Sequence, residues 1–438
     1  MRRRLCGWGR YPTVEAFEIE GEDLEAITRD VVLSRGLGRS YGDASLPPPG
    51  PLRVAATHRA DRILSFDPTT AVLRAQAGLS LERLNRFFLE RGYFSPVTPG
   101  TEQVTLGGMV AADVHGKNHH VAGTIGAHVR ALRLRLPDGT IHRIDPASSK
   151  ELFDATIGGM GLTGHILEVE LCLEKIPSPW IVESSQLHGD LECLIDGLRQ
   201  ASGQWPFTVA WADLMARAGG NGRGILLQGR WADAAQARAE APRRAPHVTI
   251  PCAAPRLMLS NPTIACHNAL RMAAARRAPQ TRLTSPQRFF YPLDAIRRWN
   301  LLYGRRGMTQ YQCVLPWDAG MASYRRLVDI ARRHGPGPFL CVIKDCGAAG
   351  DGRLSFPMPG ISFAMDFPVA GGITQALVDD LNDHVAAAGG RIYLAKDAFT
   401  RREHFQAMEP RLGAWRELRN RVDPRRHVRS ALSERLLD

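Results

Sequence analysis

The sequence predicts two domains, each of which mixes helices with strands. The chain has 438 residues, more than the roughly 250–300 that one hydrophobic core usually reaches. About the first 175 residues show short strand patterns, Gly-rich turns and two helices, and the composition changes near Lys175-Ile-Pro-Ser-Pro179. From there to about residue 390, helical and strand patterns alternate. We therefore place a domain boundary near residue 178.

The first half carries clear local signals. Ser80 is a good N-cap for a helix whose apolar face is Leu81, Leu84 and Phe88. A second helix is expected over Glu151–Ile157. Residues 129–136 alternate as a half-buried strand does, and Pro137-Asp-Gly139 turns the chain into the next strand. The expected strands are Val31–Leu33, Arg53–Ala56, Arg62–Phe66, Ala71–Ala75, Val129–Leu136, Thr140–Ile144 and His165–Leu173.

The second half is less regular. The stretch 232–287 is rich in Ala, Arg and Pro and weakly periodic, so we expect partly mobile loops, which often serve as lids. After Gly389-Gly390, a short strand at Arg391–Ala395 is expected to lead into a helical, basic tail.

The charge balance points to an anionic partner. Lys and Arg total 56 against 44 Asp and Glu, a net charge of +12. Such a surface attracts nucleic acid, acidic membrane or a phosphorylated substrate. No nucleic-acid module and no aromatic–basic repeat is present, which argues against nucleic acid. Two interpretations remain: an ordinary solvated basic surface, and a role with phosphate or anionic lipid.

The cysteines and the N-terminus bear on location. The eight cysteines form no CxxC pair, so neither metal spacing nor a disulfide framework is indicated and reduced cytoplasmic thiols are expected. Residues 1–10 do not resemble a secretory signal, and no apolar run approaches the roughly 20 residues that span a bilayer. We expect a cytoplasmic protein that reaches any membrane substrate by peripheral contact with the membrane surface.

Three Gly-rich loops suggest that backbone N–H groups meet a phosphorylated ligand. The first, Ser34–Asp43, has glycines at 36, 38 and 42; alone, it is equally a Gly-rich hairpin. The second, Pro99–His120, has small residues at 107, 108, 111 and 112, with Thr101 and Thr105 as hydroxyl donors. The third is Gly158–Gly164. An extended, doubly phosphorylated cofactor would use all three.

A metal site is not predicted. His115, His119 and His120 lie close in sequence, but the motif has no HExxH glutamate. Gly116 also argues against one continuous helix through the three. Cofactor contact or core packing is the better interpretation.

Together the motifs resemble the vanillyl-alcohol-oxidase-type flavoproteins. The chain is most similar to the decaprenylphosphoryl-ribose 2′-oxidases, the flavin subunits of an arabinose-forming epimerase. This resemblance runs nearly end to end. Its most specific elements are HGKNHH and YxAKD. The motifs that carry it are Gly7–Arg10, Arg35–Asp43, Val114–His120, Thr309–Gln312, Leu354–Pro357, Asp366–Pro368, Tyr393–Asp397 and Val422–Pro424.

The resemblance implies an α+β, two-domain fold with non-covalent FAD. Residues 1–178 and 391–438 would form the FAD-binding domain, and 179–390 a substrate cap built on an antiparallel sheet. Many relatives attach flavin to a His near the first loop, where this chain has Tyr41. The implied FAD contacts are Ser34, Arg35, Gly36, Leu37, Gly38, Arg39, Ser40, Tyr41, Gly42, Asp43, Ala44, Gly100, Thr105, Leu106, Gly107, Gly108, Ala112, Asp113, Val114, His115, Ile166 and Tyr393.

The resemblance also implies the catalytic groups. Hydride would pass from a C–H carbon to the flavin while the hydroxyl loses its proton. Lys396 is expected near both, either stabilising the reduced flavin or acting as base if burial lowers its pKa; the alternative is a surface lysine. His115 and Tyr41 are expected beside it. The implied substrate contacts are Lys117, Trp211, Tyr291, Gln312, Lys344, Ser362, Ala364 and Lys396.

Some of these residues have other interpretations. Lys117 or Lys344 is expected to hold the lipid phosphate, and Lys344 is a charge inside an apolar strand, which is unusual for an unpaired lysine. Trp211 and Tyr291 are equally plain core. Ala364 stands where the family often has Cys, and Ser362 where it has Asn. A thiol is therefore not needed here, thiol-directed inhibitors are expected to fail, and sugar contacts are expected to differ.

The implied reaction is oxidation of a polyprenyl-phosphoryl-β-D-ribose at the 2′ carbon. A short-chain NAD(P)-dependent ketoreductase partner would then reduce the keto sugar to the arabinose epimer. The alternatives are a related oxidase of a free sugar, aldonolactone or other secondary alcohol, and a non-catalytic basic scaffold.

Overall fold

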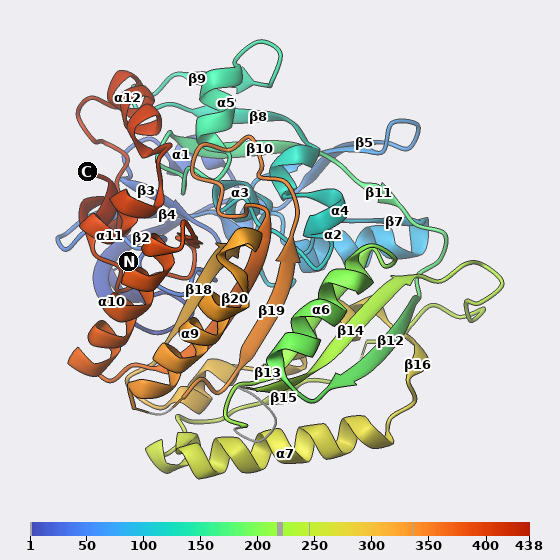
Figure 1. Ribbon diagram of the computed structural model, residues 1–438. Coiled ribbons are helices and arrows are strands. Elements are labelled where there is room, and N and C mark those ends of the chain that lie inside the picture. The colour runs from blue at the N-terminus through green and yellow to red at the C-terminus, as the bar shows by residue number, and fades with distance from the viewer. Residues whose placement is uncertain (1, 217–221, 245, 336) are drawn as a thin grey trace.

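Two small sheets organise the N-terminal half of the chain (Figure 1). The computed structural model describes residues 2–216, 222–244, 246–335 and 337–438. The mixed first sheet has the order β1 (Arg2–Cys6), β2 (Thr13–Glu20), β4 (Arg53–Ala56), β3 (Leu33–Arg35). The antiparallel second sheet has the order β5 (Ile63–Asp67), β6 (Val72–Gln76), β10 (His165–Cys172), β8 (Val129–Arg135), β9 (Ile141–Ile144). The strands predicted in this half are present, displaced by at most two residues.

Short helices share one hydrophobic core with the strands of the second sheet. Ser80 caps α2 (Leu81–Phe88) by accepting a hydrogen bond from the N–H of Arg83 at 3.2 Å, and the predicted apolar face is buried. Such a cap stabilises a helix by about 1 kcal/mol. The other helices of this half are α1 (Leu24–Ile27), α3 (Leu106–Ala111), α4 (His119–Ala122) and α5 (Lys150–Thr156). A two-stranded pairing of β7 (Tyr93–Phe94) with β11 (Glu174–Lys175) leads out of this half.

An eight-stranded antiparallel sheet dominates the rest of the chain. Its two halves come from strands before and after residue 300. The order is β16 (Thr281–Thr284), β12 (Ile181–His188), β14 (Arg223–Trp231), β13 (Phe207–Asp213), β19 (Cys341–Cys346), β20 (Gly360–Pro368), β18 (Met308–Pro316), β21 (Arg391–Ile392). Mixed helices with antiparallel sheet agree with the predicted α+β class.

Three helices cover one face of this sheet (Figure 1). They are α6 (Leu191–Ser202), α9 (Gly320–Arg333) and α10 (Gly372–Ala387). Inward residues such as Ile343 and Phe363, both fully buried, pack beneath them. Because side chains alternate along a strand, the intervening residues point to the opposite face, which carries the candidate site.

The predicted loops at 232–287 are partly wrong. Residues Asn261–Arg277 form the 17-residue helix α7, preceded by Ser260 and with Pro262 in its first turn. Only Ile264, Asn268 and Met272 of this helix are buried, one every four residues, so a narrow contact stripe left little periodicity in the sequence. The flanking strands β15 (Val248–Thr249) and β17 (Ile296–Arg297) pair in parallel, and α8 (Pro286–Phe290) follows β16. Residue 245 lies outside the described chain.

The C-terminal tail returns to the first half. The predicted strand at Arg391–Ala395 is only the two-residue β21, which pairs with β18. The following helices are α11 (Arg402–Met408) and α12 (Leu412–Val422). The indole N–H of Trp415 donates to the carbonyl of Ala155 at 3.1 Å, and the N–H of Arg429 donates to Val32 at 2.9 Å. No helix among the described residues has the length and apolarity to cross a bilayer.

Candidate functional site

The first Gly-rich loop has a row of backbone donors with no partner. Within the described chain, the N–H groups of Gly36–Ser40 make no hydrogen bond. Gly38 has φ +65°, a conformation that favours glycine. The Nε of Arg39 is likewise buried without a partner, and its guanidinium lies 4.1 Å from the ring centre of Trp8. Unpaired donors beside a cation are the chemistry that a pyrophosphate requires.

Other predicted residues of this loop hold its shape. Arg35 donates to the carbonyls of Cys6 and Ser45 at 2.6 and 3.0 Å. The carboxylate of Asp43 receives two hydrogen bonds from Arg435, at 2.8 and 2.9 Å. A Cβ on Gly42 would lie 1.8 Å from the carbonyl of Asp397, so this glycine permits a close backbone approach. Ser34 bonds the ring of His165, and Ala44 is buried.

The second loop contributes a tightly packed wall. The Thr105 hydroxyl caps α3 by accepting from Gly108, and the N–H groups of Leu106 and Gly107 donate to Leu79 and Ala77. Gly100, by contrast, faces open space. Asp113 and Val114 are buried, and the Asp113 carboxylate accepts from Gly126 and Ser355. Most backbone N–H groups of the second loop are thus hydrogen-bonded within the protein.

The third loop uses part of its backbone donors within the protein. The N–H groups of Gly158, Gly159, Met160 and Leu162 all donate to nearby carbonyls. Gly158 and Gly161 have φ values of +73° and +75°. These glycines allow a tight turn between α5 and β10. The N–H groups of Gly161, Thr163 and Gly164 make no hydrogen bond within the described chain, so contact of this loop with a cofactor stays a prediction.

Strand register gathers most of the predicted substrate residues on one face of the large sheet. Gln312 of β18 is paired with Ala364 of β20, which is paired with Val342 of β19. Val342 is paired with Trp211 of β13. Lys344 is paired with Ser362. Directly opposite residues in antiparallel strands share a face, so Trp211, Gln312, Lys344, Ser362 and Ala364 line the same surface, opposite the face that the three helices cover.

His115 meets this face from the second loop. Its Nε2 lies 3.0 Å from the amide nitrogen of Gln312, which can only donate. Burial lowers the pKa of His115 well below its usual value, helped by the charge of Lys344. The neutral ring therefore carries its proton on Nδ1, which is buried and has no acceptor in the described chain. An acceptor atom on a bound ligand would satisfy it.

Tyr393 and Lys396 reach the same place from the C-terminal segment. The N–H of Tyr393 donates to the carbonyl of Gln312, and its hydroxyl donates to the carbonyl of Ala112, both at 2.9 Å. Its ring centre lies 5.2 Å from that of His115. The Lys396 ammonium lies 3.8 Å from the ring centre of Tyr41, whose N–H donates to Ala395. The structure thus brings together all three predicted catalytic residues.

Two partly buried lysines at this face have lowered pKa values. Burial lowers the pKa of Lys396 to about 7; the Asp366 carboxylate opposes this effect and the Lys344 charge adds to it. Burial also lowers the pKa of Lys344. The backbone of Lys344 is paired with Ser362 in the sheet, but its ammonium makes no hydrogen bond or ion pair within the described chain. An anion placed here would restore both charges.

A buried polar network beneath Lys396 was missed in the sequence. Gln310, two residues before Gln312 in β18, donates to Asp366 at 2.5 Å. The Tyr303 hydroxyl donates to the same carboxylate at 3.1 Å. Burial raises the pKa of Asp366 to about 6. Alternation with Gln312 and Ala364 would have placed Gln310 and Asp366 on the site face; nothing in the sequence indicates Tyr303.

Three predicted residues are engaged in packing. The Lys117 ammonium donates to the carbonyl of Phe289 and lies 4.3 Å from the centre of that ring, and burial lowers its pKa to about 7. The Tyr291 hydroxyl accepts from Asn85 of α2 at 2.9 Å inside the core. Ile166 is buried in β10, where it is paired with Leu134.

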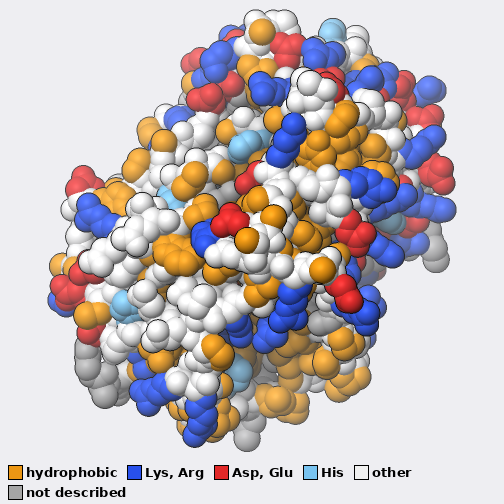
Figure 2. Space-filling model, turned by 90° about the vertical axis from the view of Figure 1, so that its right-hand side faces the viewer, with side chains coloured by type: hydrophobic (Ala, Val, Ile, Leu, Met, Phe, Trp, Pro, Cys, Tyr) orange, Lys and Arg blue, Asp and Glu red, His pale blue; other side chains and the backbone are white. Residues whose placement is uncertain are grey.

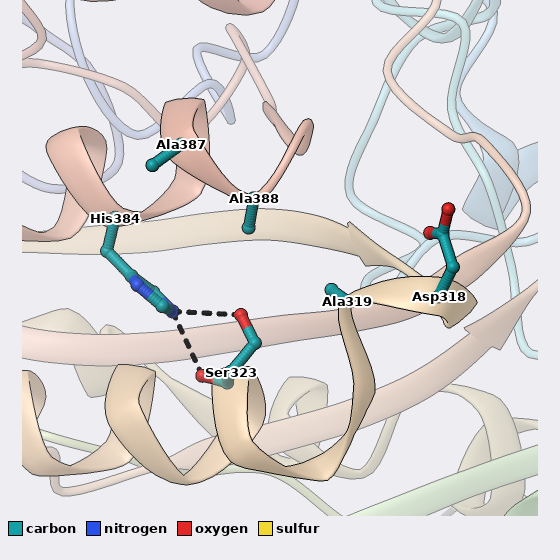
Figure 3. Close-up of a pocket in the computed structure, with 6 residues that line it drawn as sticks. All are labelled: Asp318, Ala319, Ser323, His384, Ala387 and Ala388. Carbon is teal, nitrogen blue, oxygen red and sulfur yellow. Dashed lines mark hydrogen bonds between the residues drawn. The ribbon is translucent and has the colours of Figure 1, made fainter.

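Neither the histidines nor an outer cavity form a competing site. His119 accepts from the N–H of Gly347, and His120 contacts the carbonyl of Trp205. Among the described residues, no group of three or more His, Cys, Asp or Glu is placed to hold a metal. A surface cavity of about 410 Å³ lies beside α9 and α10, where His384 bonds Ser323 (Figure 3). None of the predicted site residues lines it.

The residues present fit FAD. Free loop amides and Arg39 suit a pyrophosphate, and the buried Nδ1 donor of His115 with the Lys396 amine suits a ring that becomes anionic when reduced. Bound FAD supplies the capacity to accept a hydride. The surrounding residues supply orientation, charge and a proton acceptor.

Comparison with known proteins supports this conclusion. Residues 26–145 match the FAD binding domain family. The chain is 35% identical to decaprenylphosphoryl-β-D-ribose oxidase from Mycolicibacterium smegmatis, over 99% of this chain and 97% of that protein. It is also 35% identical to an uncharacterised protein from Streptomyces coelicolor, over 82% of this chain and all of that protein.

More distant relatives share only part of the chain. D-lactate dehydrogenase from Anaerostipes hadrus is 32% identical over 27% of this chain and 26% of its own length. The partial extent of this match contrasts with the nearly full-length match to the mycobacterial oxidase.

Proposed function

We propose, because the chain belongs to the family of decaprenylphosphoryl-β-D-ribose oxidases, that it oxidises the 2′-hydroxyl of a polyprenyl-phosphoryl-β-D-ribose to the 2′-keto sugar. The chain is an FAD-dependent oxidoreductase. The observation that carries the proposal is the sheet face on which Lys396, Lys344 and Gln312 meet His115. A short-chain ketoreductase partner would consume the keto sugar and form the arabinose epimer.

The site residues divide the work of this reaction. Lys396, whose pKa is about 7, takes the proton of the reacting hydroxyl in its neutral form. The side chains of Gln312 and Ser362 offer hydrogen bonds that orient the sugar; the Gln312 Nε2 and the Ser362 Oγ lie 3.3 Å apart. Lys344, a cation without a carboxylate partner, attracts the phosphate of the lipid-linked sugar. Trp211 supplies a flat wall on the same face.

The organisation of the domains follows from this assignment. Residues 1–178 and 391–438 form the cofactor domain, and 179–390 form the substrate cap. β21 crosses between the two, since it pairs with β18 directly before Tyr393 and Lys396. FAD is held without a covalent bond, because the first loop contains no histidine; acid precipitation of the protein should leave the flavin in the supernatant.

Anaerobic mixing of the purified flavoprotein with a prenyl-phosphoryl-ribose tests the reaction. We expect the visible flavin band to bleach in a single phase and a 2′-keto sugar to form in equal amount. Free ribose and an aldonolactone are the comparison substrates. Bleaching by those compounds with equal efficiency would replace the proposed substrate by a free sugar or lactone. If none of the three compounds bleached the flavin, the proposal that the protein oxidises such an alcohol would be wrong.

The pH dependence of flavin reduction reports on Lys396. Because the neutral amine is the base, the rate should rise with pH through about 7 and then level off. The Asp366 carboxylate raises the pKa of Lys396, so Asp366→Asn should move the rise to lower pH. Single-turnover reduction measured from pH 5 to 9 gives both curves.

A matched carboxylate serves as the control for this shift. Asp351 is exposed and does not lie on the site face, so Asp351→Asn should leave the curve in place. If the rate of flavin reduction in Asp366→Asn still rose near pH 7, with FAD retained, the electrostatic coupling of Asp366 to Lys396 would be contradicted.

A further inference from the structure

Most of the net positive charge of the chain comes from one segment. Residues 246–306 contain ten arginines, no lysine and one acidic residue, Asp294. This segment therefore carries +9 of the net charge of +12, although it spans 61 of the 438 residues. Charges spread evenly along the chain would not concentrate in one segment in this way. We call residues 246–306 the basic layer.

The basic layer is one connected structure at one end of the molecule. β15 pairs with β17, the N–H of Ala254 donates to Leu301 at 2.9 Å, and α7 packs on the short helical turn that precedes it. Figure 1 places α7 and β15 at the lower end of the molecule. In the side view of Figure 2, blue and orange side chains gather at that end and red ones are few.

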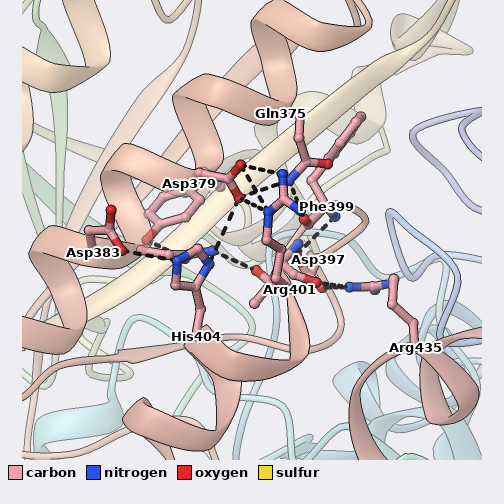
Figure 4. A network of polar contacts seen from close by, with 11 residues as sticks. Gln375, Asp379, Asp383, Asp397, Phe399, Arg401, His404 and Arg435 are labelled. Atoms are coloured by element: carbon pink, nitrogen blue, oxygen red, sulfur yellow. Dashed lines mark hydrogen bonds and ion pairs between the residues drawn. The ribbon is translucent and has the colours of Figure 1, made fainter.

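Most exposed arginines of this layer have no acidic partner; Arg282, which pairs with Glu183 at 2.7 Å, is an exception. Arg143, outside the layer, pairs with Glu170 at 3.1 Å, and Arg401 pairs with Asp379 at 2.9 Å, the latter within a larger polar network (Figure 4). The guanidinium groups of five exposed arginines of the layer make no ion pair or hydrogen bond within the described chain. They are Arg276, Arg277, Arg297, Arg305 and Arg306.

Apolar side chains stand exposed among these arginines. Val248 is 65% exposed, Met258 50% and Leu270 66%. None of the three is aromatic, so the layer lacks the stacking platforms with which proteins bind single-stranded nucleic acid. Exposed aliphatic side chains between unpaired arginines match an anionic bilayer, where the former enter the headgroup region and the latter meet lipid phosphates.

The inner side of the same helix contacts the candidate site. The guanidinium of Arg271 lies 4.4 Å from the ring centre of Trp211, and Met272 packs with Trp211 and Ile225. Trp211 belongs to the face that carries Lys344 and Gln312. A membrane on the outer side of α7 would therefore lie one helix away from the substrate face.

We propose that the basic layer docks this protein on an anionic lipid bilayer, with α7 between the bilayer and the substrate face. The inference rests on the proposed function for its purpose, since a polyprenyl-linked sugar resides in a membrane. Docking on this side delivers the lipid-anchored sugar phosphate to Lys344 along a short path. Binding to the bilayer needs neither FAD turnover nor substrate.

Vesicle sedimentation of the FAD-loaded protein tests the surface directly. We expect binding to vesicles of phosphatidylglycerol and phosphatidylcholine, weaker binding as salt rises, and little binding to phosphatidylcholine alone. Each basic residue at an anionic surface is worth about fivefold in affinity. Arg276→Glu with Arg277→Glu should therefore weaken binding by at least about 25-fold, and Leu270→Glu should weaken it independently.

Matched variants distinguish an effect of the basic layer from an effect of the total net charge. Arg29 and Arg86 are exposed and make no bond or ion pair within the described chain, so Arg29→Glu with Arg86→Glu changes net charge equally and should leave binding intact. Ile373→Glu, at a position of α10 that is 54% exposed, is the control for Leu270→Glu. Retained melting temperature and flavin content show that each variant is folded.

The outcomes distinguish this inference from the proposed reaction. Equal losses in both arginine pairs, or equal binding to duplex DNA and to the anionic vesicles, would overturn the docking surface. Turnover of a water-soluble, short-chain prenyl-phosphoryl-ribose without vesicles should be the same in the Arg276/Arg277 variant and the wild type. Vesicle binding without any such turnover would overturn the proposed reaction and leave the docking surface standing.

Discussion

Replacing Lys396 by alanine is expected to leave FAD bound and to slow flavin reduction by about 10²–10⁴-fold, the range that a positioned general base contributes. Lys396 lies against Tyr41 and above the buried Asp366 network, and its pKa of about 7 makes a neutral amine available near neutral pH. Stopped-flow absorbance of the flavin band under anaerobic conditions measures the effect.

Two further lysine variants define the role. Lys396→Arg keeps a positive charge but cannot lose a proton, so it should remain as slow as alanine if the lysine is a base. Recovery of the rate in Lys396→Arg would instead assign Lys396 to stabilising the anionic reduced flavin. Lys175→Ala, at an exposed position, should reduce normally, and a normal rate in Lys396→Ala would remove Lys396 from the mechanism.

Replacing Arg435 by alanine is expected to lower the free energy of unfolding by about 3–5 kcal/mol, because it leaves two buried carboxylates without their cation. Arg435 contacts Asp397, the residue after Lys396, at 2.8 Å (Figure 4). It also contacts Asp43 of the first loop at 2.8 Å. Chemical denaturation of the FAD-loaded protein measures the loss. Faster release of FAD should accompany it, since the same contact fixes the loop.

A double variant tests the cause of this destabilisation. Burial raises the pKa of Asp43, and the pairing with Arg435 opposes that rise. Adding Asp43→Asn to Arg435→Ala removes one of the two unpaired charges, so part of the lost stability should return. Arg425 is exposed and makes no bond within the described chain, so Arg425→Ala should have little effect. Equal losses in the Arg425 and Arg435 variants would exclude the buried bridge as the cause.

Local signals predicted most elements of the first half. The Ser80 cap and the apolar spacing of Leu81, Leu84 and Phe88 depend on contacts within one or two helical turns, and the structure confirms them. Alternation over residues 129–136 predicted β8 for the same reason. Helix α7 was missed because only one residue in four is buried, which leaves hardly any periodic pattern.

Family resemblance indicated the site residues that belong to motifs. It did not indicate the residues that support them from beneath, Asp366 and Tyr303. Lys396, His115, Tyr41 and Gln312 were expected, and the structure brings them together. Asp366 was noted only as part of a motif, and Tyr303 lies in a stretch without one. Their hydrogen bond joins residues 63 positions apart, and a contact of that kind has no local pattern.

Residue order alone sufficed for the caps, the turns and the alternation of individual strands, because these reflect interactions between close neighbours along the chain. The folded chain was needed to show that β18, β19 and β20 lie side by side, and that their register aligns Gln312 with Ala364 and Lys344 with Ser362. It also showed that the arginines of α7 share one end of the molecule while Trp211 packs beneath them. Pairings between distant strands depend on the packing of the whole core, which no short stretch of sequence contains.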